Sequence, residues 1–149
     1  MKKENLAIIT NEKTYLSEKK YFCDNIDAKS IPEGLNSDFD VRLYVRKSKI
    51  ERKSHEINLK KIVVSNGLIS YIFNILRLIK IDSKYLIISL SPYTFIIYLF
   101  LLIFRKKVFV YLRSDGYEEY KCYSKFFGPT IYHFMFIIAS WGSHLIACR

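Results

Sequence analysis

Residues 84–120 read KYLIISLSPYTFIIYLFLLIFRKKVFVYLRSDGYEEY, and this stretch decides the fold. An apolar run at 85–90 breaks at Ser91-Pro92, a second at 93–104 ends on three cations, and a third at 108–112 leads into Arg113-Ser114-Asp115-Gly116. The outer runs are short and rich in β-branched and aromatic residues, as strands are. The middle run starts after a proline and ends on basic residues, which favours a helix. We therefore predict strand, helix and strand, with both strands buried on both faces as in a parallel sheet.

The first two apolar runs of this stretch have a second interpretation. Residues 85–104 carry no charge and are followed by cations, which is also typical of a membrane-spanning helix with a cytoplasmic flank. Pro92, Ser89 and Ser91 lie inside that run, and the next apolar run is too short to cross back. We favour the α/β interpretation, and the alternative is a small integral membrane protein with helices near 85–104 and 130–147.

The composition bounds the class of protein. The chain has 149 residues, half of them hydrophobic, which is enough for one domain, 1–149, with its own core. A net charge of +10 predicts an anionic partner, such as a phosphorylated substrate or an anionic membrane surface. Twelve tyrosines interleave with lysines, but no nucleic-acid-binding motif accompanies them, so we expect no nucleic acid partner. Three cysteines and the lack of a signal-peptide pattern predict a cytoplasmic protein with reduced thiols.

Strand and helix patterns alternate along the rest of the chain. Short apolar runs predict strands at 6–9, 41–45, 61–64 and 144–148, and helical periodicity predicts helices at 68–79, 117–125 and 129–140. Residues 11–40 look polar and irregular, with room for one or two short helices. Gly142 fits a left-handed helix cap. The sum is a Rossmann-like, doubly wound α/β domain with a mostly parallel sheet and helices on both faces.

Polar residues follow each predicted strand. If the strands are parallel, these residues line one edge of the sheet, where ligands of such folds bind. We expect Asp115 to orient or deprotonate an acceptor hydroxyl, or else to cap the next helix. Three His residues without common spacing predict no metal site, and we expect no cofactor. The predicted substrate-binding residues are Asn11, Asn66, Ser91, Tyr93, Arg113, Ser114 and Glu118.

Two of these residues have a structural alternative. Arg113 can hold a phosphate through its planar fork, or form an ion pair with Glu118 or Glu119. Asn66, before a helix, can bind an anion or a sugar hydroxyl, or serve only as a helix cap.

Five short stretches of the sequence resemble the N-terminal domain of a family 4 glycosyltransferase, which has the two-domain GT-B fold. They read LAIIT, IVVSNG, YLIISLSP, VFVYLRSDGYEEY and HLIACR. The resemblance covers most of the chain and is strongest at RSDGYEEY. It implies transfer of a sugar from a nucleotide-sugar to a glycan or lipid-linked acceptor in cell-surface glycan biosynthesis. It also implies a cytoplasmic enzyme, peripheral at the inner face of the cell membrane.

The chain departs from that family in three places. Thr10-Asn11-Glu12-Lys13 contains no glycine where relatives carry a pair that approaches the donor phosphates, and Ser114-Asp115 replaces a His-Asp pair. The second domain, which binds the nucleotide-sugar in relatives, is absent. We therefore expect an acceptor-side domain that is inactive alone, either part of a longer enzyme or the subunit of a split one, including a non-catalytic subunit.

Overall fold

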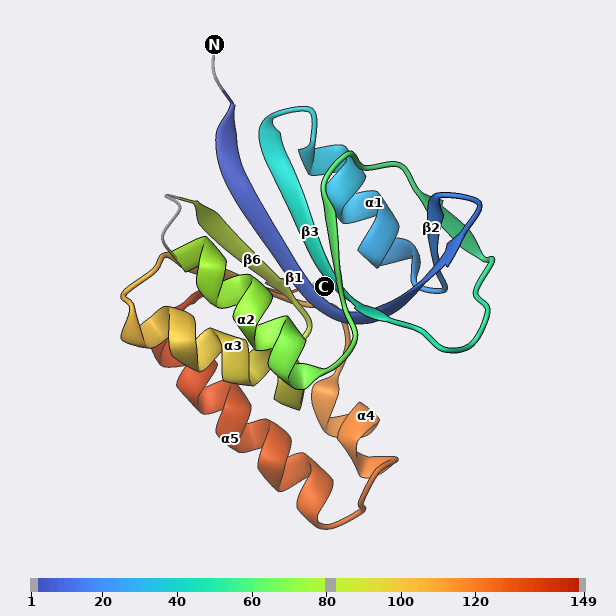
Figure 1. Ribbon diagram of the computed structural model, residues 1–149. Helices are drawn as coiled ribbons and strands as arrows, with labels where there is room; N and C mark the ends of the chain where they lie inside the picture. The colour runs from blue at the N-terminus through green and yellow to red at the C-terminus, as the bar shows by residue number, and fades with distance from the viewer. Residues whose placement is uncertain (1–2, 80–82, 148–149) are drawn as a thin grey trace.

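The computed structural model describes residues 3–79 and 83–147 as one sheet with helices packed on it (Figure 1). Within these ranges the chain forms eight strands and five helices. In chain order they are β1 (Glu4–Ser17), β2 (Lys20–Cys23), α1 (Ile26–Leu35), β3 (Phe39–Lys47), β4 (His55–Ile57), β5 (Ile62–Ser65), α2 (Leu68–Ile79), β6 (Lys84–Ile88), α3 (Pro92–Ile103), β7 (Val108–Leu112), α4 (Gly116–Lys121), α5 (Phe127–Gly142) and β8 (His144–Ala147).

Six of the strands pair in parallel, in the order β5-β3-β1-β6-β7-β8. Numbered along the chain, these strands have the order 3-2-1-4-5-6 of a Rossmann sheet. The α/β class and the mostly parallel sheet predicted from the sequence are thus confirmed, and the topology is consistent with a Rossmann-like fold. Because the six strands run the same way, their carboxyl ends meet at one edge.

The quoted stretch folds as predicted, into β6, α3 and β7. Ser91 caps α3 in a capping box with Thr94, and Pro92 occupies the first turn, where a missing N–H costs nothing. At the other end Arg105 has φ of 51°, and Arg105 and Lys106 donate their N–H groups to Leu102 and Leu101. This is the Schellman arrangement, built without glycine.

Residues 85–104 are therefore not one continuous helix, because β6 ends at Ile88 and α3 begins at Pro92. Over residues 3–79 and 83–147, no helix combines the length and the apolar character needed to cross a bilayer.

Helices lie on both sides of the sheet, but they cover it unequally. α2, α3 and α5 pack against one face (Figure 1) and enclose the larger core, which includes Tyr71, Tyr98 and Met135. α1 packs on the other face, over the half of the sheet that contains β1 and β3. The prediction that β7 is buried on both faces is wrong, because Phe109 and Tyr111 point to the sparsely covered side and are only half-buried.

The amino-terminal third differs most from its prediction. β1 continues past Asn11 to Ser17 and turns back into β2, so the segment predicted to be irregular contains an antiparallel hairpin. β4 adds a third antiparallel strand to it. The loop of the hairpin is Glu18-Lys19, and both residues have positive φ, as a two-residue hairpin turn requires. Asn-Gly usually marks such turns, and neither residue is present here.

Gly142 does not act as a left-handed cap, because it has no positive φ and Ser143 follows α5 in an extended conformation. Its role is steric. A Cβ at Gly142 would overlap the Tyr98 hydroxyl and a methyl group of Leu102, so the glycine lets α5 approach α3 closely. The predicted last strand is confirmed as β8, and Cys148 lies outside the described residues.

Candidate functional site at the carboxyl edge of the sheet

Asn11 of β1, Arg46 of β3 and Tyr93 of α3 meet near the carboxyl ends of the central strands. Asn11 accepts a hydrogen bond from Arg46, with 2.9 Å between Oδ1 and Nη1. The Arg46 guanidinium lies 3.8 Å from the centre of the Tyr93 ring, on which it stacks. Arg46 makes no ion pair with a carboxylate in the described part of the chain. A half-buried cation is thus held in place by an amide and an aromatic ring at the end of the central strands.

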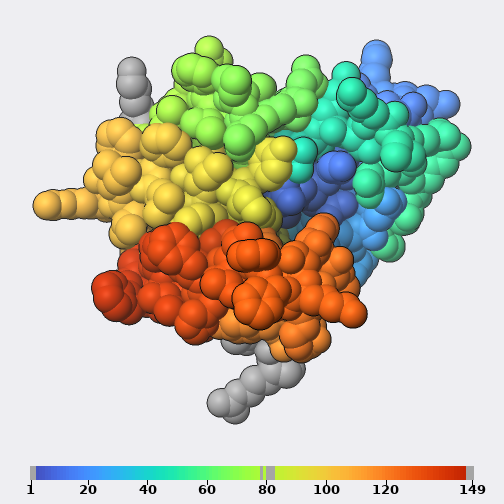
Figure 2. Space-filling model, turned by 90° about the horizontal axis from the view of Figure 1, so that it is seen from below, coloured from blue at the N-terminus to red at the C-terminus, as the bar shows by residue number. Residues whose placement is uncertain are grey.

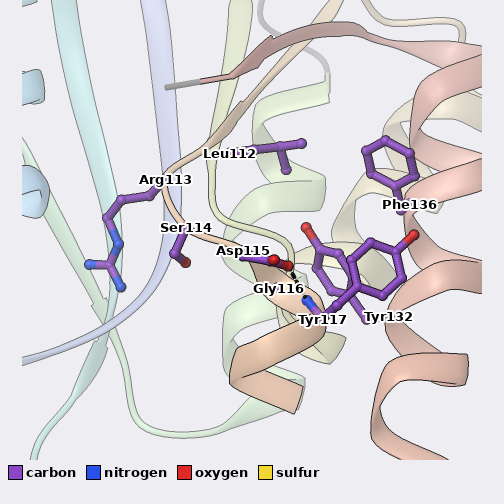
Figure 3. Close-up of a pocket in the computed structure, with 8 residues that line it drawn as sticks. All are labelled: Leu112, Arg113, Ser114, Asp115, Gly116, Tyr117, Tyr132 and Phe136. Atoms are coloured by element: carbon purple, nitrogen blue, oxygen red, sulfur yellow. Dashed lines mark hydrogen bonds between the residues drawn. The ribbon is translucent and has the colours of Figure 1, made fainter. Parts of the chain in front are cut away.

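A cavity of about 350 Å³ lies beyond the end of β7 (Figure 3). Asp115 caps α4 here: its Oδ1 accepts a hydrogen bond from the Tyr117 N–H at 2.9 Å. The cap fixes the orientation of the carboxylate at the mouth of the cavity. Ser114 donates its hydroxyl hydrogen to Glu119. The residues that line the cavity are Leu112, Arg113, Ser114, Asp115, Gly116, Tyr117, Tyr132 and Phe136.

The inner wall of this cavity is aromatic. The rings of Tyr117 and Tyr132 meet edge to face with centroids 4.9 Å apart, and Phe136 stacks on Tyr132. Burial raises the pKa of the Tyr132 hydroxyl above its ordinary value, and Tyr117, Asp115 and Glu119 raise it further. Tyr132 is therefore neutral at physiological pH and can serve there as a hydrogen-bond donor. One side of the cavity is apolar and the other carries Arg113 and Asp115.

Arg113 links this cavity to a second one of about 530 Å³. Its guanidinium points away from the aromatic rings (Figure 3) and lies 3.8 Å from an Asp27 oxygen and 3.9 Å from a Glu119 oxygen. These distances are too long for hydrogen bonds, so the ion pairs are loose. The second cavity is lined by Glu12, Asp24, Asn25, Ile26, Asp27, Arg52 and Arg113.

Carboxylates outnumber cations in the second cavity, where Arg52 and Arg113 face three acidic side chains. Arg52 binds Asp24 tightly and lies 3.8 Å from Glu12. Burial raises the pKa of the Glu12 carboxyl above its ordinary 4.5, and the nearby Arg52 offsets part of that effect. Mixed donors and acceptors of this kind suit a ligand rich in hydroxyl groups better than an isolated phosphate.

The remaining predicted site residues have local roles. Ser91 caps α3 and exchanges hydrogen bonds with Thr94. Asn66 is exposed in the turn between β5 and α2, where Gly67 accepts the Tyr71 N–H. Glu118 forms an ion pair with Lys121 one turn along α4, and it lines neither cavity. The alternative predicted for Arg113, an ion pair with Glu118 or Glu119, is realised with Glu119.

Five residues near this edge are missing from the predicted site: Glu12, Asp24, Asp27, Arg46 and Arg52. Arg46 directly follows the predicted strand 41–45, and Glu12 directly follows Asn11, so the rule of polar residues after strands would have found both. Asp24 directly follows β2, Asp27 lies in the first turn of α1, and Arg52 lies in the loop before β4. No sequence pattern signals those three positions.

Among the described residues, no group of three or more His, Cys, Asp or Glu side chains is arranged to hold a metal ion. Comparison of the chain with protein-family models, with curated proteins and with solved structures gives no match.

Proposed function

We propose that the chain is the acceptor-side, N-terminal domain of a GT-B glycosyltransferase with a doubly wound, Rossmann-like sheet. In a complete cytoplasmic enzyme it would serve the transfer of a sugar from a nucleotide-sugar to an acceptor hydroxyl during cell-surface glycan biosynthesis. One observation carries the proposal: the parallel strands bring Arg113, Ser114 and Asp115 to a cavity at the carboxyl edge, beside a second cavity rich in carboxylates.

Asp115 is the proposed catalytic residue, because its carboxylate stands at the mouth of the cavity with a fixed orientation. A carboxylate there accepts the proton of an acceptor hydroxyl, or aligns that hydroxyl for attack on the sugar. The apolar wall of Tyr117, Tyr132 and Phe136 supplies a stacking surface for a sugar ring. Glu12 and Asp27 in the second cavity extend the row of acceptors for sugar hydroxyls.

Phosphate groups of the donor or of a lipid-linked acceptor require cations at the same edge. Arg46 is the better placed one, because it is oriented by Asn11 and Tyr93 and forms no ion pair with a described carboxylate. Arg113 is loosely paired, and a phosphate within reach would compete for it. The nucleotide itself would bind mainly to a second domain, so we expect no transfer by this chain alone.

A binding assay on the purified chain tests the proposal. Saturation-transfer NMR with a panel of mono- and disaccharides should detect weak binding. Asp115→Asn should reduce the affinity of the best saccharide about tenfold, because asparagine keeps the helix cap but removes the charge-assisted hydrogen bond. Asp38→Asn is the matched control, since Asp38 is exposed before β3, at the amino edge of the sheet.

The Asp38→Asn protein should bind like the unmodified chain. Absence of binding by every saccharide, or equal affinities of the Asp115→Asn and Asp38→Asn proteins, would contradict the proposal.

A further inference from the structure

The outward side of α2, α3 and α5 is unusually apolar. The three helices lie next to one another as green, yellow and orange-to-red bands in Figure 2. Together they contain one charged residue, Arg77, and no acidic one. A helix that covers a sheet in a water-soluble domain normally carries charges on its outer face. α1, on the opposite side of the sheet, follows that rule with Asp27, Lys29 and Glu33.

α5 shows the pattern most clearly. Five large side chains recur at spacings of three and four residues, so they lie along one face of the helix. They are exposed by 68, 50, 62, 38 and 90%, and they form what we call the α5 stripe: Phe127, Ile131, Phe134, Ile137 and Trp141. Tyr123 and Phe126 continue it before the helix begins, at 85 and 82% exposure.

The neighbouring helices extend this surface. Ile69 and Phe73 of α2 are mostly exposed, as are Ile103 and Phe104 at the end of α3. The edge of the Phe95 ring, on α3, meets Phe134 of the stripe. Large apolar side chains that are exposed together on neighbouring helices mark a site of contact with another molecule or with a membrane.

Cations border the apolar surface. Arg77 lies in the last turn of α2, Arg105 and Lys106 follow α3, and Lys125 precedes α5. Arg77, Arg105 and Lys125 make no ion pair with any acidic side chain in residues 3–79 and 83–147. An apolar, aromatic centre with a basic rim is complementary to an anionic lipid surface, in which rings enter the interface and cations meet the headgroups.

We propose that this face docks the protein onto the surface of an anionic lipid bilayer, with the α5 stripe entering the interface and α5 lying parallel to the membrane plane. A second copy of the chain is a poorer occupant, because it would bring one basic rim against another on molecules of net charge +10. This inference does not rest on the proposed sugar transfer, since it uses none of the residues at the carboxyl edge.

Trp141 provides a direct test, because it is the one tryptophan of the sequence and lies in the stripe. Vesicles of phosphatidylglycerol and phosphatidylcholine should shift its emission to the blue, and brominated acyl chains should quench it. Vesicles of phosphatidylcholine alone should have a much smaller effect. An emission spectrum that anionic vesicles leave unchanged would overturn the proposal.

Vesicle flotation with variants tests the same face without relying on fluorescence. The double change Phe127→Ser and Phe134→Ser should reduce the bound fraction at least tenfold, with the urea unfolding curve as the check on folding. Ile50→Ser is the matched control, because Ile50 is 75% exposed on the loop before β4, and it should bind like the unmodified chain.

Equal loss of binding in the stripe variant and in the control would contradict the proposal. So would a chain that dimerises through the stripe and does not bind vesicles.

Discussion

Gly116 is buried in the wall of the cavity of about 350 Å³ beyond the end of β7, which we call the β7 cavity. A Cβ at this position would overlap the Tyr132 ring, whereas a Cβ at Gly34 in α1 would meet nothing within 4 Å. We expect Gly116→Ala to lower the free energy of unfolding by about 1–3 kcal/mol, the usual cost of overpacking a core. Gly34→Ala should instead raise it slightly, because alanine favours the helical conformation more than glycine does. Urea unfolding of both variants checks this, and equal effects would show that Tyr132 does not pack on Gly116.

Glu12 predicts a pH dependence. Burial raises the pKa of its carboxyl, so the folded chain holds this proton more tightly than the unfolded chain does. Its contribution to stability is therefore present below the unfolded pKa and is lost as the pH rises through the folded pKa. Glu12→Gln is neutral throughout, so its stability relative to the unmodified chain should increase as the pH rises above 4.5, the ordinary pKa of the carboxyl.

Urea unfolding of the two proteins at several pH values measures this difference, from which the other carboxyl groups cancel. A difference that stays constant or decreases with pH would show that the Glu12 carboxyl is not destabilised by burial.

The residue types at the end of β7 were predictable, but their geometry was not. Arg113, Ser114 and Asp115 follow an apolar run in the sequence, which places them at a strand end. Their partners Asp27, Tyr132 and Phe136 come from 86 residues before Arg113 or from 19 to 23 residues after it, and only tertiary packing brings them together. Asp115 as a helix cap was one of two predictions at that position, and the hydrogen bond to Tyr117 confirms it.

The hairpin β1–β2 is the element that the sequence pattern does not predict. Its turn residues Glu18 and Lys19 both have positive φ, which costs a non-glycine residue about 1 kcal/mol or more. An Asn-Gly sequence would have indicated a two-residue hairpin turn, whereas the Glu-Lys sequence found here is typical of any exposed polar loop. Glu12 lies in β1 of this hairpin and Asp24 directly follows β2, and both residues line the second cavity.

The same turn offers a stabilising change. Replacing Glu18 by Asn and Lys19 by Gly should raise the free energy of unfolding by about 1–2 kcal/mol, because both new residues tolerate positive φ. Thermal unfolding monitored by circular dichroism measures the effect. Ser37→Asn with Asp38→Gly is a useful control, since neither position has positive φ and no gain is expected there. Destabilisation by the Asn-Gly change would mean that the turn has another conformation.

α3 and its flanking strands were predictable because local signals agree with tertiary burial. A proline in the first turn, Ser91 as its cap and cations after the last turn all point to the helix that forms. For β7 the local sequence does not predict the burial of the strand correctly. An apolar strand is expected to be buried on both faces, but α1 covers only the other half of the sheet, and Phe109 stacks on His144 at a half-exposed surface.

At the scale of the whole molecule, charge and apolar surface are separated. The acidic and basic groups of the candidate site gather at the carboxyl edge, whereas the outer side of α2, α3 and α5 is nearly free of charge. A protein docked through the α5 stripe would keep its cavities near the membrane surface, since the β7 cavity is built in part by Tyr132 and Phe136 of α5 itself. A lipid-linked acceptor would then meet the site without leaving the membrane.

The central claim is that the carboxyl edge of the parallel sheet binds a sugar. Amide chemical-shift mapping of the ¹⁵N-labelled chain, titrated with the saccharide that binds best, tests it most directly. We predict that the largest shifts fall on residues 12, 24–27 and 113–117, which line the two cavities. Shifts that gather instead at the amino edge of the sheet, or on the outer faces of α2 and α5, would contradict it.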